Sequence, residues 1–201
     1  MGKRLYNRDM LAGSDGNISV RLDQDRILIT PSGLPKGRLT PDDIVTVDID
    51  GKKLEGRHEA SSELLMHMFV YKQRPDIRAC VHAHPPYATS FAVAGVELAE
   101  NILPDVVVFV GRIPLTSYAA PGTGAVPEAL APFVNAHNAF LLRNHGLLTI
   151  GRTLEQAYNR HETVEHFARI VHLAGGIGQT NPLPPEDFKR LENLRRKQEK
   201  P

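Results

Sequence analysis

Two turn-forming stretches, each lying between short apolar runs, constrain the fold of this 201-residue chain more than any other feature. Residues 18–30 alternate on both sides of an Asp-Gln-Asp turn, and residues 43–56 turn at Asp50-Gly51, a dipeptide that favours hairpins. Hairpin strands pair antiparallel, so we expect a largely antiparallel sheet rather than a doubly wound parallel one. No glycine-rich nucleotide fingerprint follows a strand pattern, which argues against a Rossmann cofactor.

The remaining segments alternate between helical and extended patterns. A first helix is expected to end at Gly13, and the residues from Lys189 onward are expected to form a charged, solvated helix. Further helices are expected at 59–75, 85–95, 127–135 and 152–176, with strands at 77–84, at 105–111 and, as a pair meeting near Asn144, at 139–151. No repeat or linker interrupts the pattern, so we expect residues 1–201 to form a single α/β domain.

The composition is that of an ordinary globular protein. Hydrophobic residues make up 41% and charged residues 23%, and the formal net charge of +1 gives no overall field that would attract nucleic acid or a membrane surface. Cys80, the single cysteine, excludes an internal disulfide and is expected to be a small buried hydrophobe. With no apolar run of about 20 residues and no leader sequence, a cytoplasmic location is expected.

A His-x-His pair ends the strand pattern at 77–84. Side chains two residues apart on a strand point to the same face, so His82 and His84 can aim two imidazoles at one point. The turn at Pro85 leaves that strand end open, and His145 lies where two other strands meet. Three neutral imidazoles with an open position are what a catalytic zinc site requires.

Chance and a cupin fold each compete with a metal site as the origin of the His-x-His pair. A chain of nine histidines can produce such a pair without selection for metal binding. A cupin also presents one on a strand, but its pattern needs a glutamate a few residues later, and the next glutamate here is Glu97, beyond a helix pattern.

Glu63 follows two serines at an expected helix start. Free backbone N–H groups and the helix dipole favour an anion there, and Glu63 could be a fourth metal ligand or a base beside the metal. A plain N-cap serine with a first-turn acid would give the same residues. The small polar residues of two further turns could join the serines in cradling a phosphate; the set is Gly16, Asn17, Ser32, Gly33, Ser61 and Ser62.

Three other histidines carry weaker signals. His161 and His166 are five residues apart, which is not the spacing of a zinc helix, and are expected on a solvated helix face. His67 lies one turn after Glu63 and is expected to serve packing or the surface rather than to support the metal site.

Five motifs, taken together, resemble the class II aldolase/adducin family, with the greatest similarity to fuculose-1-phosphate aldolases. In order they are GSDGNIS, ITPSGLPKGRLTPDDIV, HEASSELLMH, VHAHPPYAT and LLRNHGLLTIG, and the likeness runs from about Leu5 to Gly175. The resemblance implies a three-layer α/β fold with a mainly antiparallel central sheet flanked by helices. It also implies a homotetramer whose active sites lie at subunit contacts.

The resemblance also implies roles for individual residues. His82, His84 and His145 match the zinc histidines of the family, and Glu63 matches its catalytic glutamate, which also ligates zinc in the resting state. The six small polar residues named above match its substrate-phosphate pocket. These matches predict a zinc-dependent aldolase that cleaves a small phosphorylated ketose through an enediolate.

One departure from the family pattern keeps the reaction subtype open. The aldolases place a tyrosine after the His-x-His helix, whereas residues 101–111 contain none and Asp105 stands near that place. A sugar-phosphate dehydratase, decarboxylase or 4-epimerase shares the same metal chemistry, although 4-epimerases carry aspartate where Glu63 stands. A non-catalytic, adducin-like interaction domain is disfavoured because such domains lack the three histidines.

Overall fold

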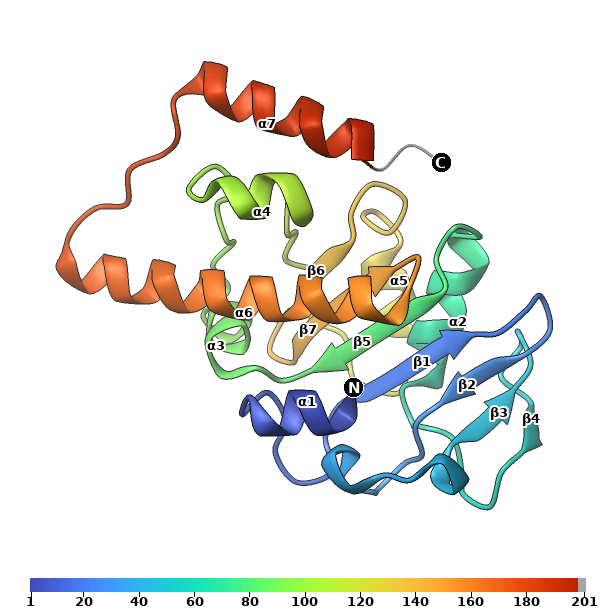
Figure 1. The fold of residues 1–201 in the computed structure, drawn as a ribbon. Coiled ribbons are helices and arrows are strands. Elements are labelled where there is room, and N and C mark those ends of the chain that lie inside the picture. Colours follow the sequence, from blue (N-terminus) through green and yellow to red (C-terminus); the bar gives the residue numbers. More distant parts are fainter. Residues whose placement is uncertain (199–201) are drawn as a thin grey trace.

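Seven strands form one sheet in the computed structural model, which describes residues 1–198. They are β1 (Asn17–Arg21), β2 (Ile27–Ile29), β3 (Val45–Val47), β4 (Lys53–Glu55), β5 (Ala79–Ala83), β6 (Ala139–Leu142) and β7 (Gly146–Gly151). Their order across the sheet is β4-β3-β2-β1-β5-β7-β6, and all six neighbouring pairs are antiparallel (Figure 1). The antiparallel sheet and both predicted hairpins are confirmed.

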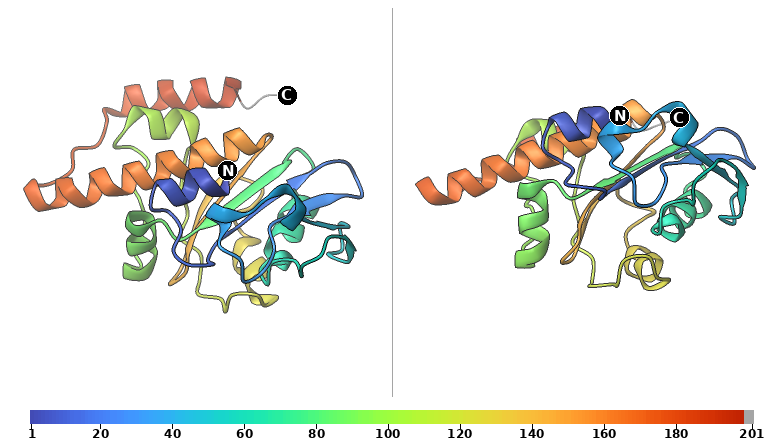
Figure 2. Two further views of the ribbon diagram at one scale, coloured as in Figure 1. Left: turned by 60° about the horizontal axis from the view of Figure 1, so that its bottom comes forward. Right: turned by 90° about the horizontal axis from the view of Figure 1, so that it is seen from below.

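Helices cover both faces of the sheet. They are α1 (Gly2–Asn7), α2 (Leu64–Gln73), α3 (Pro86–Ala94), α4 (Pro104–Phe109), α5 (Ala125–Leu130), α6 (Leu154–Ile177) and α7 (Pro185–Gln198). Two short 3-10 turns, at Lys36–Arg38 and Pro41–Asp43, follow β2. The helices α2 and α5 pack on one face, and α1 and α6 pack on the other, which gives the predicted three layers (Figure 2). None of the helices within residues 1–198 is long and apolar enough to cross a membrane.

Alternation along β5 links the two faces. Cys80 points into the core under α2 and α5, while Ala79, Val81 and Ala83 point into the core under α1 and α6. His82 lies two residues after Cys80 and therefore faces the α2 side, where Glu63 also lies. The free thiol of Cys80 is fully buried, as expected, and burial raises its pKa to about 12.

The strand prediction for residues 105–111 is wrong, because most of these residues lie in α4. Pro104 occupies the first turn, where its fixed backbone angle suits a helix start. Val106 and Val110 are four residues apart and both enter one core cluster, which is the spacing of a helix rather than a strand. Packing has thus overridden the β preference of a valine-rich run.

The N-terminal helix ends at Asn7, well before the predicted stop at Gly13. The chain reverses there because Asp9 adopts a positive φ of 56° and the Met10 amide donates to the Leu5 carbonyl. This reversal places Leu5 and Met10 in the same core cluster, which a continuous helix to Gly13 would not do.

The prediction that His161 faces solvent is also wrong, whereas His166 is exposed as expected. His161 is fully buried on the stripe of α6 that faces the sheet, between Ala157 and Val164. Its Nδ1 lies 3.2 Å from the Thr149 hydroxyl, and burial lowers its pKa to about 3. A hydrogen bond to a strand residue, which the sequence pattern does not reveal, makes this burial tolerable.

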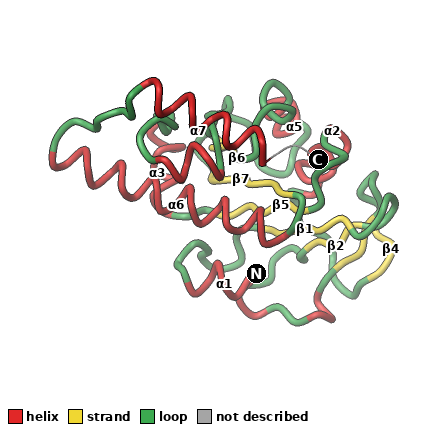
Figure 3. Tube along the Cα trace, turned by 45° about the horizontal axis from the view of Figure 1, so that its top comes forward, coloured by secondary structure: helices red, strands yellow, loops and turns green. Residues whose placement is uncertain are grey.

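The C-terminal part of the chain lies outside the main layers. The loop 178–184 carries the chain from α6 to α7, which packs against α4 and has no buried residue (Figure 3). The solvated helix expected from Lys189 is confirmed and begins earlier, at Pro185. Residues 199–201 lie outside the described part of the chain, and the single domain over 1–201 stays a prediction.

The start of α3, directly after the His-x-His pair, depends on one carboxylate from α6. Glu165 is 9% exposed, and its Oε1 and Oε2 accept hydrogen bonds from the Tyr87 and Ala88 amides at 3.0 and 2.8 Å. We predict that Glu165→Gln lowers the free energy of unfolding by about 1–3 kcal/mol, since a neutral amide offers one acceptor in place of two charged ones. Urea denaturation measures this loss.

Glu162→Gln, on the same helix, is the matched control. Glu162 forms an ion pair with Arg8, whose side chain is 63% exposed, so its loss should cost less than about 1 kcal/mol. Equal losses in the two variants would contradict the capping role of Glu165.

Candidate metal centre

Three imidazoles meet where two strand connections end side by side. His82 is the second-last residue of β5, His84 follows β5 by one residue, and His145 lies in the tight turn between β6 and β7. The centroids of their rings are 4.7–5.0 Å apart. One ligand nitrogen from each histidine lies within 4.8 Å of the other two. This is the convergence that the sequence predicted for a three-histidine site.

Two glycines make this close approach possible. A Cβ at Gly146 would lie 2.6 Å from His84 Cδ2 and 2.7 Å from the Ala83 carbonyl oxygen. Gly16 has a φ of 69°, and a Cβ there would lie 2.7 Å from the carbonyl oxygen of His82. Any larger residue at either position would push the strand ends apart and spread the imidazoles.

Hydrogen bonds on the outer ring nitrogens orient two of the histidines. His82 Nδ1 donates to the Leu147 carbonyl oxygen at 3.0 Å, so a neutral His82 carries its lone pair on Nε2. His84 Nδ1 lies 3.1 Å from Asp15 Oδ2, while His84 Nε2 lies 3.2 Å from His82 Nε2. A carboxylate behind a metal-binding histidine is a common outer-shell partner in proteins. Sequence reasoning missed Asp15, although it stands inside the GSDGN turn.

The Glu63 carboxylate completes the cluster from the first residue before α2. Its Oε2 lies 3.1 Å from His82 Nε2, and its Oε1 lies 3.2 Å from His145 Nε2. Glu63 is 8% exposed, and Oε1 is buried without a hydrogen bond. Burial alone would raise the pKa of Glu63, but His82 and His145 outweigh it and hold the pKa far below its ordinary value. Glu63 is therefore an ionised carboxylate.

The facing atoms of this cluster are mostly electron-pair acceptors. Burial lowers the pKa of His84 to about 4, so this imidazole is neutral near pH 7. Burial also opposes the charge of His82, although the Glu63 carboxylate leaves the pKa of His82 raised. Lone pairs of imidazole nitrogens and carboxylate oxygens pointing at one spot repel each other unless a cation lies between them. A borderline divalent metal such as zinc fits this donor set.

A chain of buried hydrogen bonds positions the Glu63 carboxylate. Asn17 Nδ2 donates to Glu63 Oε2 at 2.8 Å, so Asn17 Oδ1 is left to accept from His67 Nε2 at 2.5 Å. His67 Nδ1 then accepts from Ser19 Oγ at 2.6 Å, and Ser19 Oγ accepts from the Tyr71 hydroxyl at 2.7 Å. Every bond in the chain runs in one direction, from Tyr71 to Glu63.

His67 therefore supports the site, which sequence reasoning considered the less favoured role. The ring is fully buried, and burial lowers its pKa to about 3. Its contact with Asn17 comes from a residue fifty positions earlier in the chain, so spacing along the helix could not reveal it.

The predicted phosphate-pocket residues lie on three neighbouring segments. The Ser32 amide donates to the Glu59 carbonyl and the Ser61 amide donates to the Thr30 carbonyl, so the segments 30–33 and 59–62 run side by side. Ser32, Gly33 and Ser62 are exposed. Asn17, by contrast, is 2% exposed and binds Glu63. Phosphate binding by this set stays a prediction.

Lys36 joins two of these segments and was missed from the sequence. Its Nζ donates to the carbonyl oxygens of Ser14 and Leu34, at 2.6 and 2.8 Å, and the residue is only 4% exposed. Burial lowers its pKa, while Asp15 and Glu63 oppose that effect. No sequence pattern distinguishes this lysine from a surface lysine.

Asp105 lies apart from the other candidates in this chain. It is exposed in the first turn of α4, which packs into the same core cluster as α6. Glu63, in contrast, precedes α2 on the opposite face of the sheet.

Comparisons with known proteins agree with the site and the fold. Residues 1–172 match the model for the class II aldolase and adducin N-terminal domain. A 5-deoxy-D-ribulose 1-phosphate aldolase from Bacillus thuringiensis serovar kurstaki is 35% identical over 199 residues, which cover 98% of this chain and 91% of that protein. A 3-oxo-tetronate 4-phosphate decarboxylase from Haemophilus influenzae is 32% identical over 197 residues, which cover 96% and 93% of the two chains.

A solved structure of an L-fuculose 1-phosphate aldolase is similar over nearly its whole length. It is 35% identical to this chain and superimposes with a TM-score of 0.87, covering 96% of this chain and 91% of that one. The predicted family resemblance and the three-layer fold are both confirmed.

The arrangement predicts graded effects on metal affinity. His84→Ala removes a ligand and should leave the purified protein without bound metal. Asp15→Asn keeps the ligand but weakens its orientation, and should lower metal affinity by about 10–100-fold. Competition with a chromophoric chelator, together with elemental analysis, measures both effects. His166→Ala, at an exposed position on α6, is the control, and normal metal content in His84→Ala would contradict the site.

Proposed function

The chain belongs to the class II aldolase and adducin family, and on that premise we propose that it is a zinc-dependent aldolase that cleaves a small phosphorylated ketose. The single observation that carries the proposal is the buried Glu63 carboxylate facing two histidine Nε2 atoms at 3.1 and 3.2 Å. A purely structural cluster would pair those acceptors with donors, whereas this one is complete only with a cation.

His82, His84 and His145 would hold the metal, with Glu63 as a further ligand when no substrate is bound. A divalent cation bound there supplies Lewis-acid catalysis, which lowers the energy of an enediolate formed from the substrate. Zinc is the metal we propose, since three neutral imidazoles leave its full double charge on the site.

Glu63 is the proposed proton shuttle. Its low pKa makes it a carboxylate at neutral pH, and the Asn17 amide fixes its Oε2. A carboxylate held at the metal centre can take a proton from a substrate carbon or hydroxyl group and return it after the carbon–carbon bond breaks. The hydrogen-bond chain through His67 keeps Glu63 in one orientation and so limits the motion lost when a substrate binds.

The exposed part of the segments 32–33 and 61–62 is the proposed phosphate pocket, together with Gly16 and Asn17. The buried Lys36 ammonium supports this assignment, because it ties the two loops together and adds a positive charge beside them. Binding a remote phosphate would orient the reacting end of the substrate at the metal.

A decarboxylase of a sugar-acid phosphate is the second candidate. The specific observation in its favour is the 32% identical Haemophilus influenzae decarboxylase, which matches this chain over 96% of its length. Residues 101–111 also lack the tyrosine expected of an aldolase, with Asp105 near its place. A dehydratase or a 4-epimerase has less support, and Glu63 in place of aspartate argues against an epimerase. A non-catalytic adducin-like role does not account for the three histidines.

One assay separates these candidates. Zinc-loaded protein is incubated with a panel of phosphorylated ketoses, keto acids and pentuloses, and the products are followed by NMR. Release of an aldehyde supports the aldolase, loss of carbon dioxide from a keto acid supports the decarboxylase, and an epimer or a dehydrated product supports the remaining alternatives. No turnover of any phosphorylated sugar would contradict the proposal.

We predict that Glu63→Gln lowers turnover of the identified substrate by roughly 10²–10⁴-fold while the three histidines still bind metal. The amide keeps the shape of the side chain and the hydrogen-bond partner of Asn17, but it cannot accept a proton. Turnover and metal content are measured on the same samples. Glu59→Gln, whose side chain is 85% exposed, is the matched control. Retention of both metal and normal turnover would reject the shuttle role.

A homotetramer and a cytoplasmic location remain proposals that rest on family resemblance and composition. The run 105–111 no longer supports an interface strand, because Val106, Val107 and Val110 are buried inside the chain's own core. We expect multi-angle light scattering to give a tetramer at micromolar concentration. A monomer that turns over substrate at full rate would remove the shared active site from the proposal.

A further inference from the structure

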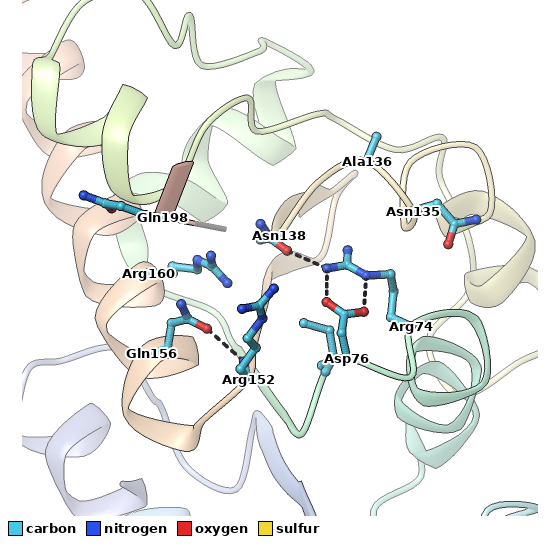
Figure 4. A pocket seen from close by; sticks show the side chains of 10 residues that line it. Arg74, Asp76, Asn135, Ala136, Asn138, Arg152, Gln156, Arg160 and Gln198 are labelled. Carbon is cyan, nitrogen blue, oxygen red and sulfur yellow. Dashed lines mark hydrogen bonds and ion pairs between the residues drawn. The ribbon is translucent and has the colours of Figure 1, made fainter. Parts of the chain in front are cut away.

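A second polar pocket lies at the end of the sheet opposite the metal centre (Figure 4). Arg74 and Asp76 precede β5 and Arg152 follows β7, whereas the His-x-His pair lies at the far end of β5. Five strand residues at about 3.3 Å each put roughly 16 Å between the two sites. The cavity measures about 190 Å³. It can hold a small ion with several waters, because one water takes about 30 Å³.

The lining of this pocket is strongly cationic. It carries three guanidinium groups, from Arg74, Arg152 and Arg160, and one carboxylate, from Asp76, so the lining has two net positive charges. The 24-residue helix α6 begins beside the pocket, and Gln156 in its first turn lines the wall. The positive end of the α6 dipole therefore adds to the same field.

Two of the guanidinium groups are held in fixed planes by the backbone. Arg160 is 6% exposed, and its Nη1 and Nε donate to the carbonyl oxygens of Ile150 and Phe109 at 2.7 and 3.2 Å. Arg74 forms a fork with Asp76, with both N–O distances 2.8 Å, and its Nη1 donates to the Val134 carbonyl at 3.0 Å. Groups fixed in this way lose little further freedom when they bind a ligand.

The remaining polar groups turn toward the same space. Figure 4 shows the guanidinium groups of Arg152 and Arg160 and the side chain of Asn138 directed at the middle of the pocket. Asn138 Oδ1 lies 3.3 Å from Arg74 Nη2 and accepts from it, so the amide NH₂ of Asn138 faces away from Arg74. The pocket is thus built largely from N–H donors on a rigid frame.

We propose that this pocket is a binding site for a small oxyanion, namely a phosphate or carboxylate group. Guanidinium groups match the oxygens of such anions two at a time, and charge-assisted hydrogen bonds of this kind are stronger than neutral ones. A bound oxyanion would join the segment before β5, the start of β6 and the first turns of α6. The site is distinct from the proposed phosphate pocket beside Glu63 and does not depend on the proposed reaction.

The test titrates the metal-loaded full-length protein with inorganic phosphate at constant chloride and follows backbone hydrogen–deuterium exchange by mass spectrometry. Phosphate should protect the segments 135–139 and 152–160, and the protection should saturate. Protection confined to the segments 30–34 and 59–64 would report binding only beside the metal centre and would overturn the proposal.

Two substitutions with opposite expected signs make the test specific. Arg152→Gln should raise the half-saturating phosphate concentration at 152–160 by about 10–100-fold, since it removes charge-assisted hydrogen bonds. Asp76→Asn should lower that concentration, because it removes the one carboxylate that competes with the ligand for Arg74. Arg26→Gln, on the exposed β1–β2 hairpin, removes the same charge far away and should change nothing. Equal half-saturation in Arg152→Gln and Arg26→Gln would refute the site.

A shortened chain identifies the source of the oxyanion. Gln198 lines the pocket, so a carboxylate from the residues after it is one source, and a free metabolite is the other. In a variant ending at Gln198, tighter phosphate binding supports a competing carboxylate from the chain itself. Unchanged binding supports a free ligand, and loss of the protection at 152–160 would count against the pocket as an oxyanion site.

Discussion

The mutual repulsion of buried electron pairs is the constraint on which the rest of this structure depends. The carboxylate of Glu63 and the Nε2 atoms of His82 and His145 point at one another across 3.1–3.2 Å in a place that water barely reaches. Such an arrangement is unfavourable by itself and becomes favourable only with a cation. The surrounding sheet, turns and helices can therefore be understood as the frame that holds these groups together in the absence of that cation.

Strand register is the means by which the frame acts. Asn17 on β1 is directly opposite His82 on β5, and Leu147, whose carbonyl orients His82, lies next to the residue opposite it on β7. A shift of one residue in either pair would turn these side chains to the α6 side of the sheet. Hydrophobic alternation in β5 opposes such a shift, because Cys80 and Val81 belong to different core layers. The geometry of the metal centre is thus coupled to the packing of the whole protein.

Local patterns were sufficient to predict the parts of the site that lie close in sequence. The His-x-His pair, its proline turn and the two hairpins needed only strand periodicity and turn chemistry. Contacts between distant segments were not predictable in this way. The link from His67 to Asn17 and the burial of His161 against Thr149 each join residues from different elements. The valine-rich run at 105–111 failed for the same reason, since its helix is set by the core into which Val106 and Val110 pack.

The helical form of α4 has an evolutionary consequence. Because α4 contributes no strand to the sheet, Asp105 in its exposed first turn can be exchanged without disturbing strand register or the metal ligands. Selection can therefore alter this position while the costly part of the protein is inherited unchanged. A lineage built on such a scaffold can diversify in the reactions it catalyses by drift at a few exposed positions, which accords with relatives named for both carbon–carbon cleavage and decarboxylation at similar identity to this chain.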